Sequence, residues 1–547
     1  MMVNQMTGKI VLMGQVLLFV LLLLRFSAAS FSADGIVAYQ DLLSPDPRSW
    51  LTYSGDYSGR RHSSLDQIRT TNVSKLAAKW IFPVPGATRL VGTPVVANGV
   101  MYVASRNAVF ALDARTGREV WRFSRPMRTD VIGDARAGIN RGVAILGEKV
   151  FFQTHDAHLL ALHAKNGSLL WETEVADHRE GYGGTMAPLV VKDKVIVGTS
   201  GGDEGARGLL DAYDVETGKR VWRFWTIPAP GEPGSETWKG SAITHGCGAT
   251  WLTGTFDPQL NSLYWTTGNP CPDFYGGDRL GDNLYTDSVL SLDPDTGKLK
   301  WYYQFTPHDT HDWDATEIPM LIDAQFQGRA QKLLVQANRN GFFYVLDRVT
   351  GKLLRATPFI QKLTWAKGIG PDGRPEVLPD TDPTPEGRKV CPSVVGGTNW
   401  FSPSYNASTG LFYVIAMEEC SFYVSSVQGY QAGRGFEGTG ANNVPGEAGQ
   451  KILRAIEVET GKIRWEYPLV GSAGSWAGTL STAGGLVFLG DDSGYFVAVD
   501  AKTGKALWQF NTGAPRLSAS PMTYVIGGRQ FVSMAAGTNI LSFGLIE

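Results

Sequence analysis

The densest group of ionisable side chains in this 547-residue chain lies at residues 306–314, Thr-Pro-His-Asp-Thr-His-Asp-Trp-Asp. Three Asp and two His within nine residues are poor material for a core strand, because unpaired charges are costly to bury. Carboxylates and imidazoles at this density suit a site that holds a cation or moves a proton. The alternative is a solvated acidic loop, and the rest of the chain has to decide between the two.

Two further polar stretches follow apolar, strand-like segments. Residues 200–208, Ser-Gly-Gly-Asp-Glu-Gly-Ala-Arg-Gly, follow the apolar residues 195–198, and Asn269 follows residues 263–265. The glycines would let the backbone approach a ligand closely. Asp203, Asn269 and Asp314 together offer two carboxylates and an amide oxygen, which are hard ligands suited to calcium rather than zinc. The sequence does not show whether the three side chains converge.

An internal repeat predicts the elements that position these residues. Seven segments of eleven residues read as strand, turn and strand, and most contain Asp-x-x-Thr-Gly and end in Trp. Their spacing is about fifty residues where uninterrupted, near the size of a four-stranded propeller blade. We therefore predict an all-β, eight-bladed β-propeller of four-stranded antiparallel blades, with the tryptophans docked between neighbouring blades. The eight blade ends are Trp80, Trp121, Trp171, Trp222, Trp301, Arg355, Trp465 and Trp508.

The predicted propeller occupies residues 31–547 as one domain. Pro- and Gly-rich insertions near residues 228–240, 356–392 and 425–450 are expected to cover one face of the ring. Residues 1–30 resemble a signal peptide, with Lys9, an apolar run at 10–24 and a small-residue stretch after Arg25. The run is short for a membrane span, although an uncleaved anchor is the alternative. We predict export to the periplasm.

The four cysteines fit an exported protein. Cys247 with Cys271 and Cys391 with Cys420 form the simplest pairing, because both pairs are local. Zinc binding is disfavoured, since the chain has no Cys-x-x-Cys pair and no His at finger spacing. The absence of Cys-x-x-Cys-His also argues against covalent haem. A net charge of -2 gives no reason to expect a nucleic-acid partner.

Taken in order along the repeat, the motifs resemble the quinoprotein alcohol dehydrogenases, haem-free periplasmic enzymes that use pyrroloquinoline quinone (PQQ) and calcium. The resemblance runs from Trp50 to the C-terminus and implies a propeller with the quinone in a central funnel. It rests on stretches 140–144, 185–188, 200–208, 249–251, 268–270, 311–314, 338–341, 399–400 and 476–479.

The resemblance implies a role for each matching residue. Asp203, Asn269 and Asp314 would bind calcium. Asp314 would also be the base that takes the hydroxyl proton of the substrate, an alcohol or alternatively an aldehyde hydrate or sugar, before hydride passes to the quinone. Trp251 would form the floor under the quinone. The residues expected to contact the cofactor are Arg141, Thr185, Ser200, Gly201, Gly202, Trp251, Arg339, Asn399 and Trp476. Electrons would leave to a periplasmic cytochrome c.

Three departures from the family pattern affect these expectations. Ala135 and Arg136 stand where the family often has adjacent disulfide-bonded cysteines, so the roof should differ, with Arg136 as a candidate to stack on the quinone. Val91 stands near a family Glu, which removes one polar contact. Thr316 replaces an Asp of lanthanide-using members, which favours calcium. The rival interpretations are a non-catalytic envelope scaffold and a degenerate member without cofactor.

Overall fold

The computed structural model describes residues 36–471 and 474–546, and Val37–Glu547 form one contact-dense unit. The predicted signal segment lies outside the described residues. Among the residues described, no helix is long and apolar enough to cross a membrane. The few helices are short: α2 (Tyr39–Leu43), α3 (Gly133–Arg136), η1 (Val73–Lys75), η2 (His178–Glu180), η3 (Ser235–Thr237) and η4 (Ala242–His245).

Within the described ranges, eight sheets contain four antiparallel strands each, which confirms the all-β prediction. The first four are β3 (Val95–Ala97), β4 (Val100–Ser105), β5 (Ala108–Asp113), β6 (Glu119–Ser124); β7 (Ala144–Leu146), β8 (Lys149–Gln153), β9 (His158–His163), β10 (Leu169–Glu174); β11 (Leu189–Val191), β12 (Lys194–Gly198), β13 (Leu209–Asp214), β14 (Arg220–Trp225); β15 (Thr255–Asp257), β16 (Ser262–Thr266), β17 (Ser288–Leu292) and β18 (Leu299–Gln304).

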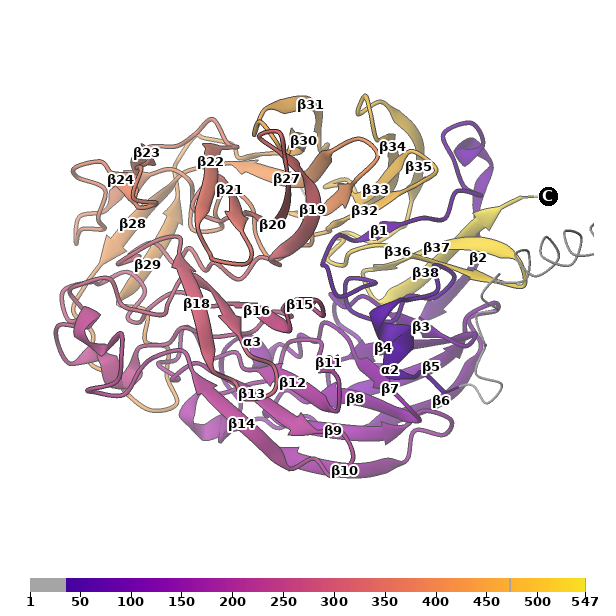
Figure 1. Cartoon of the computed structure of the whole chain (residues 1–547), viewed down its shortest axis with the longest axis horizontal. Helices are drawn as coiled ribbons and strands as arrows, with labels where there is room; N and C mark the ends of the chain where they lie inside the picture. The colour runs from indigo at the N-terminus through magenta and orange to yellow at the C-terminus, as the bar shows by residue number, and fades with distance from the viewer. Residues whose placement is uncertain (1–35, 472–473, 547) are drawn as a thin grey trace, which may run out of the picture. The chain divides into compact units, whose positions relative to one another are not determined.

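The remaining sheets continue in chain order around a ring (Figure 1). They are β19 (Met320–Phe326), β20 (Arg329–Ala337), β21 (Phe342–Asp347), β22 (Leu353–Pro358); β26 (Ser404–Asn406), β27 (Leu411–Glu418), β30 (Gln450–Glu457), β31 (Ile463–Pro468); β32 (Thr479–Thr482), β33 (Leu486–Gly490), β34 (Tyr495–Asp500), β35 (Ala506–Asn511), with β1 (His62–Ser63) paired parallel to β32; and β2 (Leu76–Pro83), β36 (Met522–Ile526), β37 (Arg529–Ala536), β38 (Asn539–Leu545).

The last of these sheets joins the two ends of the propeller. β2 comes from the N-terminal part of the chain and pairs along its whole length with β38, and β37 and β36 complete the sheet (Figure 1). This pairing closes the ring, so each four-stranded sheet packs between two neighbouring sheets. Most strand residues are therefore buried whichever face of the sheet they point to. The core is accordingly rich in Val, Leu, Ile and Phe.

Tryptophans of the outer strands dock on the neighbouring sheets, as predicted. The Nε1–H of Trp222 donates to the carbonyl of Pro294 at 3.0 Å. Its indole lies against Gly297, where an added Cβ would be 2.6 Å from the ring. Among the described residues, the same contact with a turn glycine is made by Trp80, Trp121, Trp171, Trp301 and Trp465, on Gly117, Gly167, Gly218, Gly351 and Gly504. Arg355 instead lies over the Phe326 ring of its own sheet, at 5.8 Å.

The insertions carry small sheets of their own. β23 (Ala366–Ile369) pairs with β24 (Pro375–Val377), and β28 (Ser421–Ser425) joins β25 (Arg388–Val390) to β29 (Thr439–Asn443). The sequence predicted these stretches only as loops. Short strands in Pro- and Gly-rich segments give little periodic signal, because only three to five residues alternate.

Candidate active site

One cavity of about 350 Å³ brings together the residues predicted to bind cofactor or metal, with the exception of Asn269, which does not line it. Its lining residues lie in the segments that enter the innermost strands, such as Arg141 before β7 and Trp251 before β15, or that leave the second strands, such as Arg339 after β20. These two kinds of segment meet at one end of each antiparallel sheet, so all eight four-stranded sheets contribute. The lining residues are Arg89, Asp134, Ile139, Arg141, Thr185, Ser200, Gly201, Gly202, Asp203, Glu204, Trp251, Asp312, Asp314, Arg339, Val394, Val395, Asn399, Trp400, Trp476 and Ser518.

Residues 306–314 form a largely buried loop rather than a solvated one. The Asp309 carboxylate accepts hydrogen bonds from the backbone N–H groups of His311, at 3.0 Å, and Trp313, at 2.8 Å. The Trp313 indole is fully buried and stacks on the His311 ring at 4.3 Å. Asp309 therefore shapes the loop, which leaves Asp312 and Asp314 to face the cavity.

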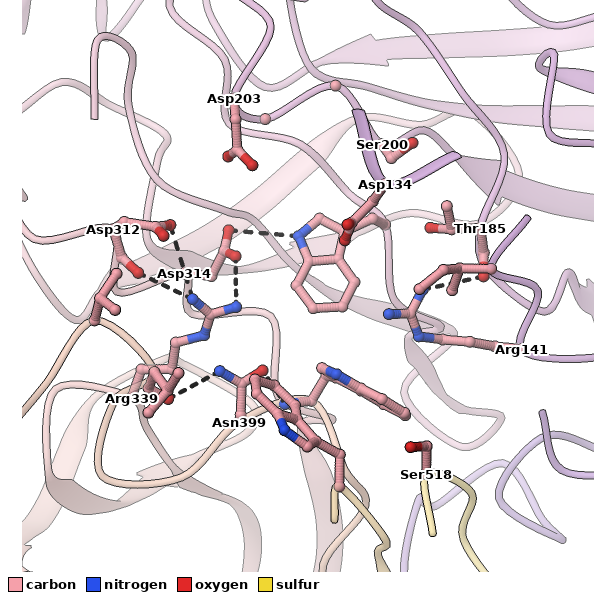
Figure 2. A pocket seen from close by; sticks show the side chains of 18 of the residues that line it. Asp134, Arg141, Thr185, Ser200, Asp203, Asp312, Asp314, Arg339, Asn399 and Ser518 are labelled. Atoms are coloured by element: carbon pink, nitrogen blue, oxygen red, sulfur yellow. Dashed lines mark hydrogen bonds and ion pairs between the residues drawn. The ribbon is translucent and has the colours of Figure 1, made fainter. Parts of the chain in front are cut away.

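Asp314 is held by three donors. Its Oδ1 accepts from the Asn269 backbone N–H at 3.2 Å and from Trp251 Nε1–H at 3.4 Å, and its Oδ2 pairs with Arg339 at 2.8 Å (Figure 2). Burial raises the pKa of Asp314, and Arg339 opposes that rise. Both oxygens are therefore fixed in position by charge-assisted or backbone hydrogen bonds.

The carboxylate of Asp273 orients the side-chain amide of Asn269. Its Nδ2 donates to Asp273 Oδ1 at 2.9 Å, which leaves Oδ1 buried and without a hydrogen-bond partner in the described structure. Buried polar oxygens without a donor are rare and call for a missing partner. A cation is the partner that suits an amide oxygen among carboxylates.

Asp203 extends into the same cavity from the segment after β12 (Figure 2). Desolvation within the cavity, followed by repulsion from Asp312 and Glu204, raises the pKa of Asp203 well above the usual range. The pKa of Asp273 is raised in the same direction, by burial and by Asp203. A bound cation would relieve this repulsion, so the residues fit the metal site that the sequence predicted. No cluster of three or more His, Cys, Asp or Glu among the described residues forms a metal site alone.

Arg339 and Asp312 lie beside this acidic group. One Arg339 nitrogen donates to the Asp312 carbonyl at 2.9 Å and lies 3.8 Å from its carboxylate. That carboxylate accepts no hydrogen bond from another described residue. Burial raises the pKa of Asp312 well above its usual range, partly offset by Arg339. Asp312 therefore has oxygens available to a ligand, in contrast to Asp314.

Arg141 is a buried cation without an acidic partner. Its guanidinium lies 4.7 Å from the Trp251 ring and 4.7 Å from the Trp400 ring, and it donates to the Thr185 carbonyl at 3.1 Å. Burial lowers its pKa to about 10. In the described structure it forms no salt bridge, and its Nε has no acceptor. An anionic ligand above Trp251 would satisfy it, which fits a carboxylate-bearing quinone.

The other predicted contact residues also line the cavity. Asn399 donates through Nδ2 to the Val395 carbonyl at 2.9 Å, and Trp476 stacks near Trp400, with ring centres 6.4 Å apart. Gly201 has φ +119°, and an added Cβ would lie 2.7 Å from the Gly181 carbonyl, so only glycine fits there. The remaining predicted residues at the cavity are Thr185, Ser200 and Gly202.

The roof differs from the sequence expectation for Arg136. Its side chain is exposed and does not line the cavity, so the structure gives no stacking position for it. The preceding Ala135 is buried, and its Cβ packs at the position that a side chain on Gly183 would occupy. Asp134 faces the cavity from α3 instead (Figure 2). Val91 is buried in the apolar cluster behind the cavity and does not line it.

Several lining residues were not predicted as site residues. Asp312 lies within the chemically dense stretch, but Arg89, Asp134, Val394 and Ser518 carry no motif. Their shared feature is position, because each lies in a segment that enters an innermost strand. The sequence signal for these residues is their position relative to the repeat, because the repeat locates the segments that enter the innermost strands.

Both predicted disulfides are present. Cys247 is bonded to Cys271, and Cys391 is bonded to Cys420. The described residues contain no free cysteine. The first bond lies directly beside the acidic group, since Cys271 follows Asn269 by two residues.

Comparison with known proteins agrees with the geometry. Residues 50–359 and 453–532 match the family model "PQQ: Glucose/ethanol/alcohol dehydrogenase, beta-propeller domain". The chain is 37% identical over 536 residues to quinoprotein alcohol dehydrogenase PedH of Pseudomonas putida, covering 92% of this chain and 89% of that protein. It is 35% identical to a lanthanide-dependent methanol dehydrogenase of Methylacidiphilum fumariolicum, covering 90% and 85%.

Solved structures give the same result. A europium-containing methanol dehydrogenase superposes with a TM-score of 0.86 at 32% identity, covering 92% of this chain and 100% of that one. The match to the family model extends over more than half of the chain, and the relatives align over nearly their whole length. This chain therefore belongs to the PQQ-dependent quinoprotein alcohol dehydrogenases.

Proposed function

We propose that this protein oxidises a small alcohol with PQQ stacked on Trp251 and a hard cation held by Asp203, Asn269 and Asp314. The observation that carries the proposal is the convergence of Asp203, Trp251 and Asp314 with Arg141 and Arg339 in one cavity. Asn269 does not line the cavity but contacts Asp314 through its backbone N–H. A non-catalytic scaffold would have no need for several carboxylates gathered at one cavity, because their mutual repulsion lowers stability. When bound, the quinone accepts the hydride and the metal polarises its carbonyl as a Lewis acid.

The chain's own residues would bind and orient the cofactor. Trp251 offers a flat face, and Arg141 offers a guanidinium without an acidic partner for a carboxylate of the quinone. Arg339 presents donors beside the metal ligands, where it is placed by Asp314. Trp476 and Asn399 would line the edge of the quinone.

We propose to divide the two roles that the family resemblance implies for Asp314, metal binding and proton removal. Its oxygens already accept two hydrogen bonds and an ion pair, which suits a fixed metal ligand. A general base needs an oxygen that can accept the substrate proton. Asp312 has such oxygens and lies beside Arg339 at the cavity wall. We assign proton removal to Asp312 and metal binding to Asp314.

We base a proposal for the identity of the metal on the charge of the site. Thr316 favoured calcium in the sequence, and it lies buried outside the cavity lining. Four carboxylates, those of Asp203, Asp273, Asp312 and Asp314, nevertheless raise one another's pKa, and the positive charges that oppose this are Arg339 and, for Asp273, Arg279. A trivalent ion neutralises such a group better than Ca²⁺, so we expect lanthanides to support activity at least as well as calcium.

The proposed electron acceptor is a periplasmic cytochrome c, because the chain has no haem-attachment motif of its own. The proposed location, reached through the N-terminal signal, is the periplasm. An oxidising compartment is consistent with two disulfides and no free thiol among the described residues.

The test is reconstitution. Purified protein should be mixed with PQQ alone, with PQQ and Ca²⁺, and with PQQ and La³⁺, while the quinone absorption and dye-linked oxidation of a series of primary and secondary alcohols are followed. We expect one quinone per chain and metal-dependent turnover. Absence of quinone binding under all three conditions would contradict the proposal, and lower turnover with La³⁺ than with Ca²⁺ would contradict the lanthanide expectation.

A further inference from the structure

Two of the proposed metal-binding residues, Asp203 and Asn269, lie on loops that meet at a disulfide. Cys271 follows Asn269 by two residues, and its Sγ lies 2.6 Å from the carbonyl oxygen of Gly202, the neighbour of Asp203. The same sulfur lies 3.4 Å from Asp273 Oδ1, the atom that orients the Asn269 amide. One side of the bond therefore touches both loops.

The other side of the bond fixes the Asn269 segment from behind. Cys247 forms an isolated antiparallel bridge with Pro270, and the next N–H, that of Gly248, donates to the Asn269 carbonyl at 2.9 Å. The Cys247 carbonyl accepts the N–H of Gly208, at the end of the loop that carries Asp203, at 2.8 Å. Both cysteines are completely buried.

An insertion covers the disulfide and reaches Asp203 directly. Phe436 and Tyr430 pack on the two cysteines, and Tyr430 also stacks on His245 at 3.4 Å. The Phe436 backbone N–H donates to the Asp203 carbonyl at 2.6 Å. We call Cys247, Cys271, Tyr430 and Phe436 the disulfide cluster. The cluster joins three segments of the chain, those that contain Cys247, Cys271 and Tyr430 with Phe436. None of these residues lies in a strand.

We propose that the disulfide cluster is a positioning device that sets the metal affinity of the site, by holding Asp203 and Asn269 in place before the cation arrives. The inference rests on the proposed metal site. Its physical basis is repulsion: Asp203, Asp312 and Asp314 lie at one cavity (Figure 2), and such like charges would move apart if the loops that carry them were not held. A cation would then have to gather the ligands, which lowers its affinity.

The test measures metal binding without enzyme turnover. Apoprotein is titrated with Tb³⁺, which takes the same oxygen ligands as Ca²⁺, and emission sensitised by protein tryptophan is recorded, with La³⁺ and Ca²⁺ as competitors. The variants are Cys247→Ala/Cys271→Ala, Phe436→Ala, and the matched control Cys391→Ala/Cys420→Ala, which removes the other disulfide. Thermal unfolding is measured in parallel.

We expect the Tb³⁺ dissociation constant to rise about tenfold or more in Cys247→Ala/Cys271→Ala, in the range found for groups that orient metal ligands. Phe436→Ala should shift it in the same direction by less. The control should lose thermal stability but stay within about twofold of wild type in affinity.

The outcomes separate this inference from the proposed function. Wild-type affinity in a folded Cys247→Ala/Cys271→Ala protein would overturn the inference, as would an equal loss in both disulfide variants. If that double variant does not fold, unchanged affinity in Phe436→Ala overturns it. Absence of any Tb³⁺ site in the wild type would instead overturn the proposed metal site.

Discussion

Asp312 and Asp314 are two residues apart in sequence but meet different surroundings. Asp314 accepts three donors, whereas the Asp312 carboxylate has only Arg339 at 3.8 Å among the described residues. Asp312→Asn should therefore retain quinone and metal while turnover falls by roughly 10²–10⁴, as expected for loss of a general base. Dye-linked kinetics and bound quinone per protein check this.

Asp314→Asn is the paired variant. It keeps one carbonyl oxygen but removes the charge next to Arg339, so metal affinity should fall and excess metal should restore part of the turnover. If Asp314→Asn retained metal and quinone yet lost turnover while Asp312→Asn stayed active, the base would be Asp314, as the sequence analysis predicted.

Glu317 gives a pH-dependent prediction outside the metal ligands. Burial raises its pKa from 4.5 to about 8, and neither carboxylate oxygen has a hydrogen-bond partner among the described residues. The folded protein therefore binds more protons here than the unfolded chain between these pKa values, so this group lowers stability as pH rises through that window. The slope is at most about 1.4 kcal/mol per pH unit.

Glu317→Gln should remove that slope. Urea unfolding at pH 5 and pH 9 should show similar stability for variant and wild type at the lower pH and a more stable variant at the higher. Glu459→Gln, at an exposed position, serves as the control and should show no such divergence. Parallel stability curves for Glu317→Gln and wild type would show that Glu317 does not titrate in this window.

At the residue scale, the sequence indicated which residue types could bind a cation but not whether their side chains lie close together. The types of Asp203, Asn269 and Asp314 predicted a hard-cation site, because ligand preference depends on the donor atoms alone. The orientation of the Asn269 amide depends on Asp273, and the roof depends on how Ala135 packs on Gly183. Such contacts join residues that no local pattern relates, so they required the structure.

At the scale of elements, six outer-strand tryptophans of the described residues pack on a turn glycine of the next sheet, whereas Trp508 donates to the Leu76 carbonyl at the start of β2. Gly297 has φ +71°, and a Cβ there would lie 2.6 Å from the Trp222 ring. Gly410 has φ +69° but open space around it. Gly410→Ala should therefore cost about 1 kcal/mol through backbone conformation alone. Gly297→Ala should cost about 1–3 kcal/mol more, because the indole must move.

Chemical denaturation of both variants measures that difference directly. Equal destabilisation would mean that the indole gives way freely and that docking contributes little. The turn and the Trp were both visible in the repeat, which is why the blade pattern could be predicted. The small sheets at β23–β25, β28 and β29 could not, because their pairing depends on tertiary contacts rather than on an alternating pattern.

At the scale of the whole molecule, the cavity is a property of the closed ring. Every four-stranded sheet supplies a lining residue, and the ring is joined where β2 from the N-terminal part pairs with β38. β38 contains no lining residue, since the last of these is Ser518. Its Ile540, Leu541 and Phe543 are buried. Their burial stabilises the fold by roughly 1.5–3 kcal/mol each.

Truncation after Thr538 should therefore abolish quinone and metal binding without removing any residue of the site. The loss of β38 leaves β2 unpaired and exposes the neighbouring sheets, at a cost comparable with the total stability of a typical protein, about 5–15 kcal/mol. Truncation after Leu545 keeps the closing pair and is the control. Circular dichroism melts and quinone titration should show a native-like control and a destabilised, non-binding shorter chain. A shorter chain that bound quinone and unfolded at the wild-type temperature would show that the site forms without closure, and the cavity would then depend on local loop structure alone.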